Sequence, residues 1–349
     1  MVERIVGHDS VAIRGAEPGY GYRNKLELSF GVRRYLPEAD KDADPLGDWM
    51  GFHPPGWFSK IVPIEQCPLA SDGINRVVRE LSASVPGPAW NNHDHTGHWR
   101  HVVIREGEGV VVNLVTHPDA EAEAVRSVGD RIAAIEGVEG VVWTVTDRLS
   151  DVAQGETRAV LHGEPTVTIA VNDVRMTLPH EAFFQVNTAG AEVLFDTITE
   201  ALGDATGATL LDLYCGVGAI GLVLGRRFDR VIGVELLASA IEVARQNALA
   251  NGIDGEWYAG PVEEVLPKLK IDGPRTIIVD PPRSGLHPKA SATLSNMTGQ
   301  ALVYVACSPS SLARDREIIE AGGWRLEKLW TVDLFPQTPH VEAVARFVR

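Results

Sequence analysis

A glycine turn between an apolar strand and an apolar helix constrains the fold of this chain most. Residues 209–213 form a largely apolar run that leads into Gly216-Val217-Gly218, and residues 219–224 continue as an apolar helix. A strand that enters a Gly-x-Gly turn and leaves it as a helix is typical of parallel α/β sheets, in which ligands bind beyond the carboxyl ends of the strands. We therefore expect Gly216 and Gly218 to border a ligand site.

The chain after residue 175 repeats this pattern of a strand followed by a helix. Strands alternate with helices there, which predicts a Rossmann-like, doubly wound α/β sheet. The expected strands are residues 209–213, 230–234, 276–279 and 302–305, with residues 341–348 as a late edge strand. The expected helices are residues 187–202, 219–224, 238–251, 262–269 and 309–322.

Residues 1–175 predict a different class of domain, α+β with an antiparallel sheet. Residues 25–32 alternate polar and apolar side chains, and an acidic loop at 37–47 separates them from a return strand at 49–53. Further strands are expected at residues 99–105, 109–115, 141–145 and 167–171, and helices at 74–81 and 120–135. We place the domain boundary near residue 175, giving domains 1–175 and 176–349.

Composition limits the possible functions. A chain of 349 residues is long enough for about two domains. Its net charge of −15 argues against general nucleic-acid binding, because that affinity comes largely from Lys and Arg on phosphates. Any RNA site must therefore be local, and Arg23, Lys25, Arg33 and Arg34 are the candidates. No apolar run is long enough for a membrane span and no signal peptide is visible, so the sequence predicts a cytoplasmic protein.

The cysteines are expected to be free thiols. Cys67, Cys215 and Cys307 are three in number and far apart, which fits neither a disulfide framework nor a Cys-x-x-Cys metal site. Four histidines between residues 93 and 101 also resemble no familiar metal site, and a polar loop is the preferred reading. We therefore predict no metal.

Glu235 is the expected partner of a ribose. It ends the strand that follows the glycine turn, where a carboxylate can hold both ribose hydroxyls. Dinucleotide binding is the rival interpretation, because Gly221 completes a Gly-x-Gly-x-x-Gly pattern. Later loops argue against it: they carry Asp280 and Cys307, for which hydride transfer has no evident need.

Cys307 follows one of the expected strands and precedes a helix. A thiol in such a loop is expected to be a nucleophile with a lowered pKa, although a free cysteine is often only a small buried apolar residue. Cys215 abuts the glycine turn and is assigned a structural part. Asp280 begins an Asp-Pro-Pro-Arg loop at the same edge of the sheet, and the two prolines hold this loop stiff.

Five motifs in order make a resemblance specific. They are Phe183-Phe184-Gln185-Val186-Asn187, Asp212-Leu213-Tyr214-Cys215-Gly216, Asp280-Pro281-Pro282-Arg283, Cys307-Ser308-Pro309 with Leu312-Ala313-Arg314-Asp315, and the run from Asp333 to Glu342. The chain resembles the RNA 5-methyluridine methyltransferases, a family with the class I methyltransferase fold that uses S-adenosylmethionine and modifies uridines of transfer or ribosomal RNA. The resemblance is strong over residues 176–349 and patchier before them.

The resemblance implies a role for each site residue. Gln185, Tyr214, Glu235 and Asp280 would contact the cofactor, Cys307 would attack the uracil, and Glu342 would act as the base. Chemistry agrees, because carbon 5 of uracil is a poor nucleophile until a thiolate adds at carbon 6. The implied partner is structured RNA, and no obligate protein partner is evident.

The chain also departs from the family pattern. Many members carry an amino-terminal barrel and a four-cysteine iron–sulfur site, and we expect this chain to lack both. Members commonly have Ser-Cys-Asn-Pro at the nucleophile, where this chain has Ala306-Cys307-Ser308-Pro309. Two alternatives stay open: a methyltransferase acting on another pyrimidine or a small molecule, and a non-catalytic RNA-binding protein that retains the fold.

Overall fold

The chain is divided into two compact units. In the computed structural model, which describes residues 2–349, unit 1 contains the residues up to Gly19, Ala170–Thr177 and Ala182–Arg349. Unit 2 contains Tyr20–Ile169 and Leu178–Glu181. The residues before Gly19 therefore group with the carboxyl-terminal part of the chain, whereas the sequence analysis placed them in the first domain. The reason is a strand pairing: β1 (Ser10–Gly15) runs parallel to β16 (Arg325–Asp333).

Unit 1 is built on a mixed sheet. Within residues 2–349 this sheet has eight strands in the order β1-β16-β17-β15-β14-β11-β12-β13. The remaining strands are β11 (Thr209–Leu213), β12 (Arg230–Glu235), β13 (Gly255–Ala259), β14 (Arg275–Val279), β15 (Ala301–Ala306) and β17 (Glu342–Val348). Neighbours from β13 to β15 pair in parallel, and β17 is antiparallel to both of its neighbours. The predicted parallel strands are thereby confirmed.

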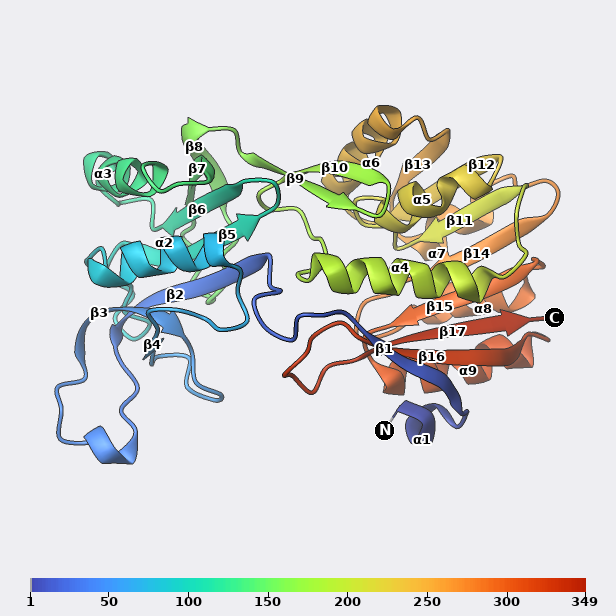
Figure 1. The fold of residues 1–349 in the computed structure, drawn as a ribbon, viewed down its shortest axis with the longest axis horizontal. Helices are drawn as coiled ribbons and strands as arrows, with labels where there is room; N and C mark the ends of the chain where they lie inside the picture. Colours follow the sequence, from blue (N-terminus) through green and yellow to red (C-terminus); the bar gives the residue numbers. More distant parts are fainter. Residues whose placement is uncertain (1) are drawn as a thin grey trace. The chain divides into compact units, whose positions relative to one another are not determined.

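Helices cover both faces of this sheet (Figure 1). One face carries α4 (Thr188–Leu202), α5 (Ala219–Leu224) and α6 (Ala238–Asn251), and the other carries α1 (Val2–Val6), α7 (Val262–Val265), α8 (Pro288–Asn296) and α9 (Pro309–Ala321). Side chains from strands and from this second group of helices, such as Ile232, Leu294 and Ile319, form one buried core. Such two-sided coverage explains why the strand sequences are apolar runs rather than alternating patterns.

The position expected for the last strand is wrong. Residues 341–348 were expected at an edge of the sheet, but β17 lies between β15 and β16, with Ala306 opposite Ala343 and Val332 opposite Glu342. Its residues are nearly all buried, as insertion between two strands requires. The edges are β1 and β13 instead.

Unit 2 holds a second, mainly antiparallel sheet. In the described chain its strand order is β4-β3-β2-β5-β6-β7-β8, and only β6 and β7 pair in parallel. The strands are β2 (Lys25–Arg33), β3 (Leu46–Phe52), β4 (Val62–Pro63), β5 (Trp99–Glu106), β6 (Val110–Thr116), β7 (Val138–Val145) and β8 (Glu156–Gly163). The predicted hairpin is present as β2 and β3, which place Phe30 opposite Met50.

Two amphipathic helices pack on this sheet, α2 (Asp72–Ala83) and α3 (Ala122–Ala133). α3 is the crossover that joins the parallel pair β6 and β7. A separate hairpin, β9 (Thr166–Val171) with β10 (Val174–Pro179), contains the point where the chain passes from unit 2 to unit 1. None of the helices in residues 2–349 has the length and apolar character needed to cross a bilayer.

Candidate active site

The candidate residues follow neighbouring strands at one edge of the unit 1 sheet. Tyr214 follows β11, Asp280 follows β14 and Cys307 follows β15, while Glu235 is the last residue of β12. The Tyr214 N–H donates to the Val234 carbonyl (2.8 Å) and the Asp280 N–H to the Leu213 carbonyl (3.2 Å), which fixes the strand ends against one another. Because β17 runs antiparallel to β15, its first residue, Glu342, lies at this same edge.

The two glycines of the turn have different neighbours. Both have positive φ, +54° at Gly216 and +82° at Gly218, which disfavours any residue with a Cβ. A Cβ at Gly218 would be 2.8 Å from the Trp257 ring, whereas one at Gly216 would meet no protein atom within 4 Å. Gly218 is therefore required for packing, and Gly216 borders open space where a ligand can approach the backbone.

Glu235 is held rigidly beside this turn. Its Oε2 accepts a hydrogen bond from the Gly216 N–H (3.2 Å) and its Oε1 accepts one from the Leu237 N–H (3.0 Å). A carboxylate has about four lone-pair positions, so two remain for further donors. Its geometry thus suits two hydroxyl groups of one sugar.

The surrounding carboxyl groups make the site acidic. Asp212 is fully buried, where its Oδ2 accepts the Gly221 N–H (2.8 Å) and its Oδ1 has no hydrogen-bond partner. Burial raises the pKa of Asp212 to about 7, with Glu235 adding to the effect. Burial, and then the charge of Asp212, likewise raise the pKa of Asp280 to about 7. A cationic ligand would relieve this crowding of acids.

Cys307 and Glu342 lie side by side. Ala306 faces Ala343 across β15 and β17, Cys307 directly follows Ala306, and Glu342 directly precedes Ala343. Burial raises the pKa of the Cys307 thiol, and Glu342 and Asp280 raise it further, while Arg283 lowers it. The expected lowered thiol pKa is therefore wrong for the protein without ligands, because burial and two neighbouring acids outweigh one arginine.

The pKa of Glu342 is also shifted upward. Only 4% of this residue is exposed, and burial followed by the charge of Asp280 raises its pKa to about 8, against the opposing effect of Arg283. The protonated form of Glu342 therefore persists to a higher pH than in an ordinary glutamate. Sequence reasoning missed Arg283 as an individual site residue, although it belongs to the Asp-Pro-Pro-Arg motif.

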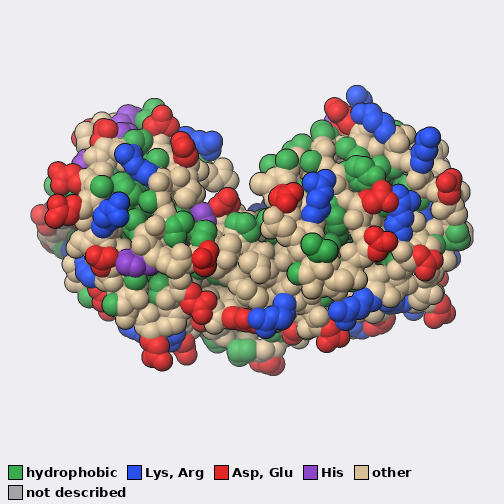
Figure 2. Space-filling model, turned by 90° about the horizontal axis from the view of Figure 1, so that it is seen from above, with side chains coloured by type: hydrophobic (Ala, Val, Ile, Leu, Met, Phe, Trp, Pro, Cys, Tyr) green, Lys and Arg blue, Asp and Glu red, His purple; other side chains and the backbone are tan. Residues whose placement is uncertain are grey.

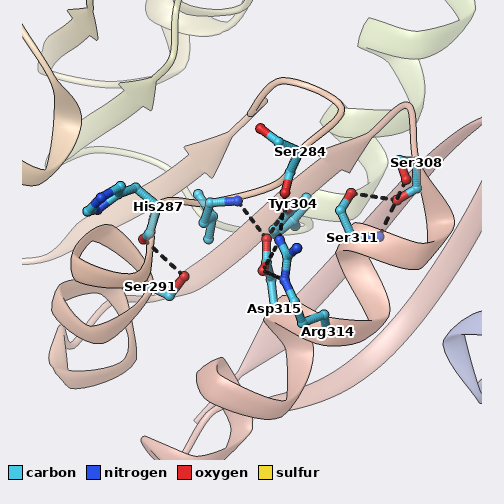
Figure 3. A network of polar contacts seen from close by, with 9 residues as sticks. Ser284, His287, Ser291, Tyr304, Ser308, Ser311, Arg314 and Asp315 are labelled. Carbon is cyan, nitrogen blue, oxygen red and sulfur yellow. Dashed lines mark hydrogen bonds and ion pairs between the residues drawn. The ribbon is translucent and has the colours of Figure 1, made fainter.

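A buried aspartate fixes the loop that carries Asp280 and Arg283 (Figure 3). Asp315 is 1% exposed, and its Oδ2 accepts hydrogen bonds from the Tyr304 hydroxyl and from the Leu286 N–H, both at 2.7 Å. Arg314 donates to Asp315 Oδ1 (2.8 Å) and to the Ser284 carbonyl (2.7 Å). Arg314 and Asp315 of helix α9 thereby hold the far end of the loop, at Ser284 and Leu286, by hydrogen bonds. The sequence showed Arg314-Asp315 as part of a motif but not this function.

The helix after Cys307 has a defined start. Ser308 is the N-cap of α9, where its Oγ accepts the Ser311 N–H (3.4 Å), and Pro309 occupies the first turn. Both residues are favourable at a helix start. Ser308 therefore fulfils a capping role at the position where the resemblance led us to expect asparagine.

Gln185 lies in the segment that leads into α4. The N-cap of this helix is Asn187, which accepts the Gly190 N–H (2.9 Å) and donates to the Leu334 carbonyl (3.0 Å). Leu334 directly follows β16, so this bond anchors the Gln185 segment near the strand that pairs with Glu342. A contact between Gln185 and a cofactor stays a prediction.

No group of three or more His, Cys, Asp or Glu side chains in residues 2–349 has the arrangement of a metal site. The histidines between residues 93 and 101 do not converge. His101, for example, is buried in β5, where its Nδ1 lies 3.3 Å from the Ser29 hydroxyl.

The sequence matches the family model described as tRNA (Uracil-5-)-methyltransferase over residues 59–257 and 268–347. These ranges include every candidate catalytic and cofactor-binding residue. The chain belongs to this family.

Relatives similar in sequence match nearly the whole chain. An RNA methyltransferase of Chlorobaculum tepidum is 35% identical over 371 residues, which cover 100% of this chain and 76% of the relative. One from Clostridium tetani is 31% identical over 97% of this chain and 74% of the relative. This family member is therefore an RNA methyltransferase.

A solved structure matches nearly the whole length of the chain. The Pyrococcus abyssi tRNA (uracil-54, C5)-methyltransferase in complex with S-adenosyl-L-homocysteine has a TM-score of 0.81 at 28% identity, covering 99% of this chain and 81% of that chain. The family uses S-adenosylmethionine, and the residues present here fit that cofactor: open space at Gly216, a clamped Glu235 and an acidic surrounding for a cationic sulfonium.

Proposed function

We propose that this RNA methyltransferase forms 5-methyluridine in transfer or ribosomal RNA, with Cys307 as nucleophile and Glu342 as base. The observation that carries the proposal is that Cys307 and Glu342 adjoin the facing residues Ala306 and Ala343, close enough for Glu342 to shift the Cys307 pKa, at the strand edge that also bears Asp280 and the glycine turn. A thiol and a carboxyl group, adjacent and partly withdrawn from water, are the two groups that substitution at carbon 5 of uracil requires.

The chain would hold the cofactor at the strand ends. Glu235 would bind the ribose hydroxyls, Gly216 would allow close approach with Gly218 supporting the turn behind it, and Gln185, Tyr214 and Asp280 would complete the contacts. The bound cofactor supplies an electrophilic methyl group. Asp280 also contributes negative charge near that group, which favours a sulfonium in this position.

Cys307 would begin the reaction on the base. Its thiolate adds to carbon 6 of uracil, forming a carbon–sulfur bond, and the electrons of the C5–C6 double bond move onto the ring as an enolate. Carbon 5 then becomes nucleophilic enough to take the methyl group. Arg283, which lowers the pKa of Cys307, favours the thiolate form.

Glu342 would complete the reaction. Carbon 5 still carries its proton after methyl transfer, and the Glu342 carboxylate removes it. The electrons of that C–H bond restore the C5–C6 double bond and expel the Cys307 thiolate. A general base contributes about 10²–10⁴-fold to such steps.

Unit 2 would recognise the RNA, and unit 1 would carry the catalysis. Acidic and basic side chains are interspersed over the face shown in Figure 2, without an extended basic area. This supports local contacts and recognition of RNA shape rather than attraction by charge alone. An extruded base suits such a site, because carbon 5 and carbon 6 must become accessible.

The test compares the protein with Cys307→Ala on unmodified transfer RNA and ribosomal RNA transcripts, with S-adenosylmethionine present. The Pyrococcus abyssi match makes transfer RNA the first choice. Mass spectrometry of the nucleosides should show 5-methyluridine in one RNA, and none with the variant. Methylation at another position, or equal activity of Cys307→Ala, would refute the covalent mechanism. Methylation of neither RNA would favour another pyrimidine, a small molecule or a non-catalytic role.

A further inference from the structure

A small cavity in unit 2 lies apart from the catalytic residues in sequence and in fold. Its volume is about 90 Å³, and it is lined by the end of β2 (Gly31 to Arg33), by residues of the 53–61 segment and by Trp90 to His93. Cavities that hold cofactors or drug-sized ligands have about 300–1,000 Å³, so this cavity can take only a small group.

Trp90, one of the residues that line the cavity, has a buried hydrogen-bond donor without a partner among the described residues. Trp90 is 3% exposed, and its Nε1 is buried without an acceptor in the part of the chain that the structure describes. The ring is held in place by the Arg100 guanidinium, 4.3 Å from its centroid, and by the stacked ring of His117 at 5.5 Å. A buried donor without a partner is costly in free energy, so these two contacts help to keep the ring in this position.

His53, another residue that lines the cavity, is held in place by two polar contacts. Its Nδ1 lies 2.8 Å from the Lys60 carbonyl oxygen and its Nε2 lies 2.6 Å from Asp151. Both ring nitrogens face acceptors, which fits a protonated ring. These two contacts also fix the ends of the segment that carries Trp57 and Phe58. The Asn92 amide adds a third anchor by donating to the Phe58 carbonyl (2.8 Å).

The segment beside the cavity, here called its rim, is aromatic and exposed. Trp57 is 51% exposed and Phe58 is 64% exposed, next to the lining residue Ser59. The Lys60 ammonium lies 3.9 Å from the centroid of the Trp57 ring and 5.8 Å from that of Tyr35. Exposed aromatic rings beside a cation are what unpaired bases stack on in single-stranded nucleic-acid sites.

The charges at the cavity are unusual for this acidic chain. The lining residues include Arg33 but no Asp or Glu, although the chain has 47 Asp and Glu against 32 Lys and Arg; the charge of the lining residue His53 is offset by Asp151. Arg33 is exposed and has no ion-pair partner among the described residues. This local reversal favours an anionic ligand such as a phosphodiester.

We propose that this cavity and its rim, Trp57, Phe58 and Lys60, bind an unpaired base of the RNA other than the target uridine, with Arg33 on the adjoining phosphate. The inference rests on the proposed function for the choice of RNA as ligand. Binding there would set which part of a folded RNA is held by unit 2 while the target base is methylated.

The test uses an all-adenosine RNA pentamer with a central 2-aminopurine, in the presence of saturating S-adenosylhomocysteine. The pentamer contains no uracil, and the added ligand blocks adenine binding at the cofactor site. The Trp57→Ala/Phe58→Ala double variant should bind it at least about fivefold more weakly than the wild type, since stacking on one ring is worth about that much. Arg33→Ala should weaken the dependence of binding on salt.

Two controls separate this proposal from the proposed function. Leu249→Ala removes a side chain that is 85% exposed on α6 of unit 1 and should bind the pentamer normally. Cys307→Ala should do the same, so a failure of the uridine chemistry leaves this result intact. Equal affinity of the wild type and the double variant would overturn the proposal. An unchanged salt dependence of pentamer binding in Arg33→Ala would also overturn it. The same holds if the protein binds an unstructured peptide but not the pentamer.

Discussion

The carboxylate of Glu342 raises the pKa of the Cys307 thiol, its neighbour across the β15–β17 pair. The base therefore opposes ionisation of the nucleophile in the protein without ligands. The reaction needs the Cys307 thiolate in its first step and the Glu342 carboxylate in its last step. This opposition therefore does not hinder a reaction in which Cys307 acts first.

Replacing Glu342 by glutamine should separate the two steps. Glu342→Gln leaves the Cys307 thiol in place but removes the group that takes the proton from carbon 5. The methylated base should then stay bound to Cys307, because the carbon–sulfur bond breaks only when that proton leaves. Denaturing electrophoresis with labelled RNA should show a protein–RNA adduct in Glu342→Gln. The Cys307→Ala/Glu342→Gln double variant is the control, and an adduct in it would contradict the assignment.

The raised pKa of Glu342 also predicts a pH-dependent stability difference. Its ordinary pKa is 4.5 and its folded pKa is about 8. The folded state thus keeps a proton that the unfolded state loses, so the contribution of Glu342 to stability is full below pH 4.5 and is lost as pH rises toward about 8. The loss is at most about 1.4 kcal/mol for each pH unit.

Glu342→Gln has no proton to lose and should escape this effect. Its unfolding free energy relative to the wild type should increase as pH rises from about 5 to 8. Urea denaturation of both proteins across this range measures the difference. A difference that stays constant with pH would show that Glu342 ionises in the folded protein as freely as in the unfolded one.

The two glycines of the turn form a matched pair. Gly218→Ala should destabilise the protein strongly, because its Cβ would press on Trp257. Gly216→Ala should cost only the strain of a left-handed backbone, about 1–2 kcal/mol, yet it should weaken binding of S-adenosylhomocysteine because the new methyl group enters the open space. Denaturant unfolding and calorimetric titration give the two quantities. Unchanged affinity in Gly216→Ala would place the ligand elsewhere.

Asp315 should matter for stability and for catalysis. Asp315→Ala leaves the buried Leu286 N–H without its acceptor, which costs about 1–3 kcal/mol, and frees the loop that bears Asp280 and Arg283. The methylation rate should fall at saturating RNA and cofactor. Glu317→Ala, at an exposed position of the same helix, should change neither the rate nor the urea midpoint. A full rate in a folded Asp315→Ala protein would rule out the positioning role.

Much of the unit 1 fold was predictable because its strands are apolar runs ended by conspicuous turns. The four expected parallel strands of unit 1 are present within a residue of their predicted bounds. The order of strands was not predictable in the same way. β17 reads like any strand, and only its pairing with β15 and β16 shows that it is internal. β1 and β16 were missed because they pair across nearly the whole length of the chain.

Some features of the candidate site were predictable from the sequence and others were not. Motifs that end strands pointed to Glu235, Asp280 and Cys307, and the shared edge of a sheet brings such residues together. Their assigned roles stay predictions. The ionisation of Cys307 was misjudged because the sequence does not show how deeply a loop is buried or which acids face it. The Asp315 contacts were missed because they join residues of β15, of the loop after β14 and of α9.

The pairing of β1 with β16 has a consequence for synthesis on the ribosome. Unit 2 is nearly continuous, from Tyr20 to Ile169, and all of its strands emerge before most of unit 1 has been made. β1 emerges first but finds its partner only when Arg325–Asp333 has been translated. Since domains generally fold as units during translation, unit 2 should form first while β1 waits as an unpaired strand. The first strand to be made is thus among the last to be folded.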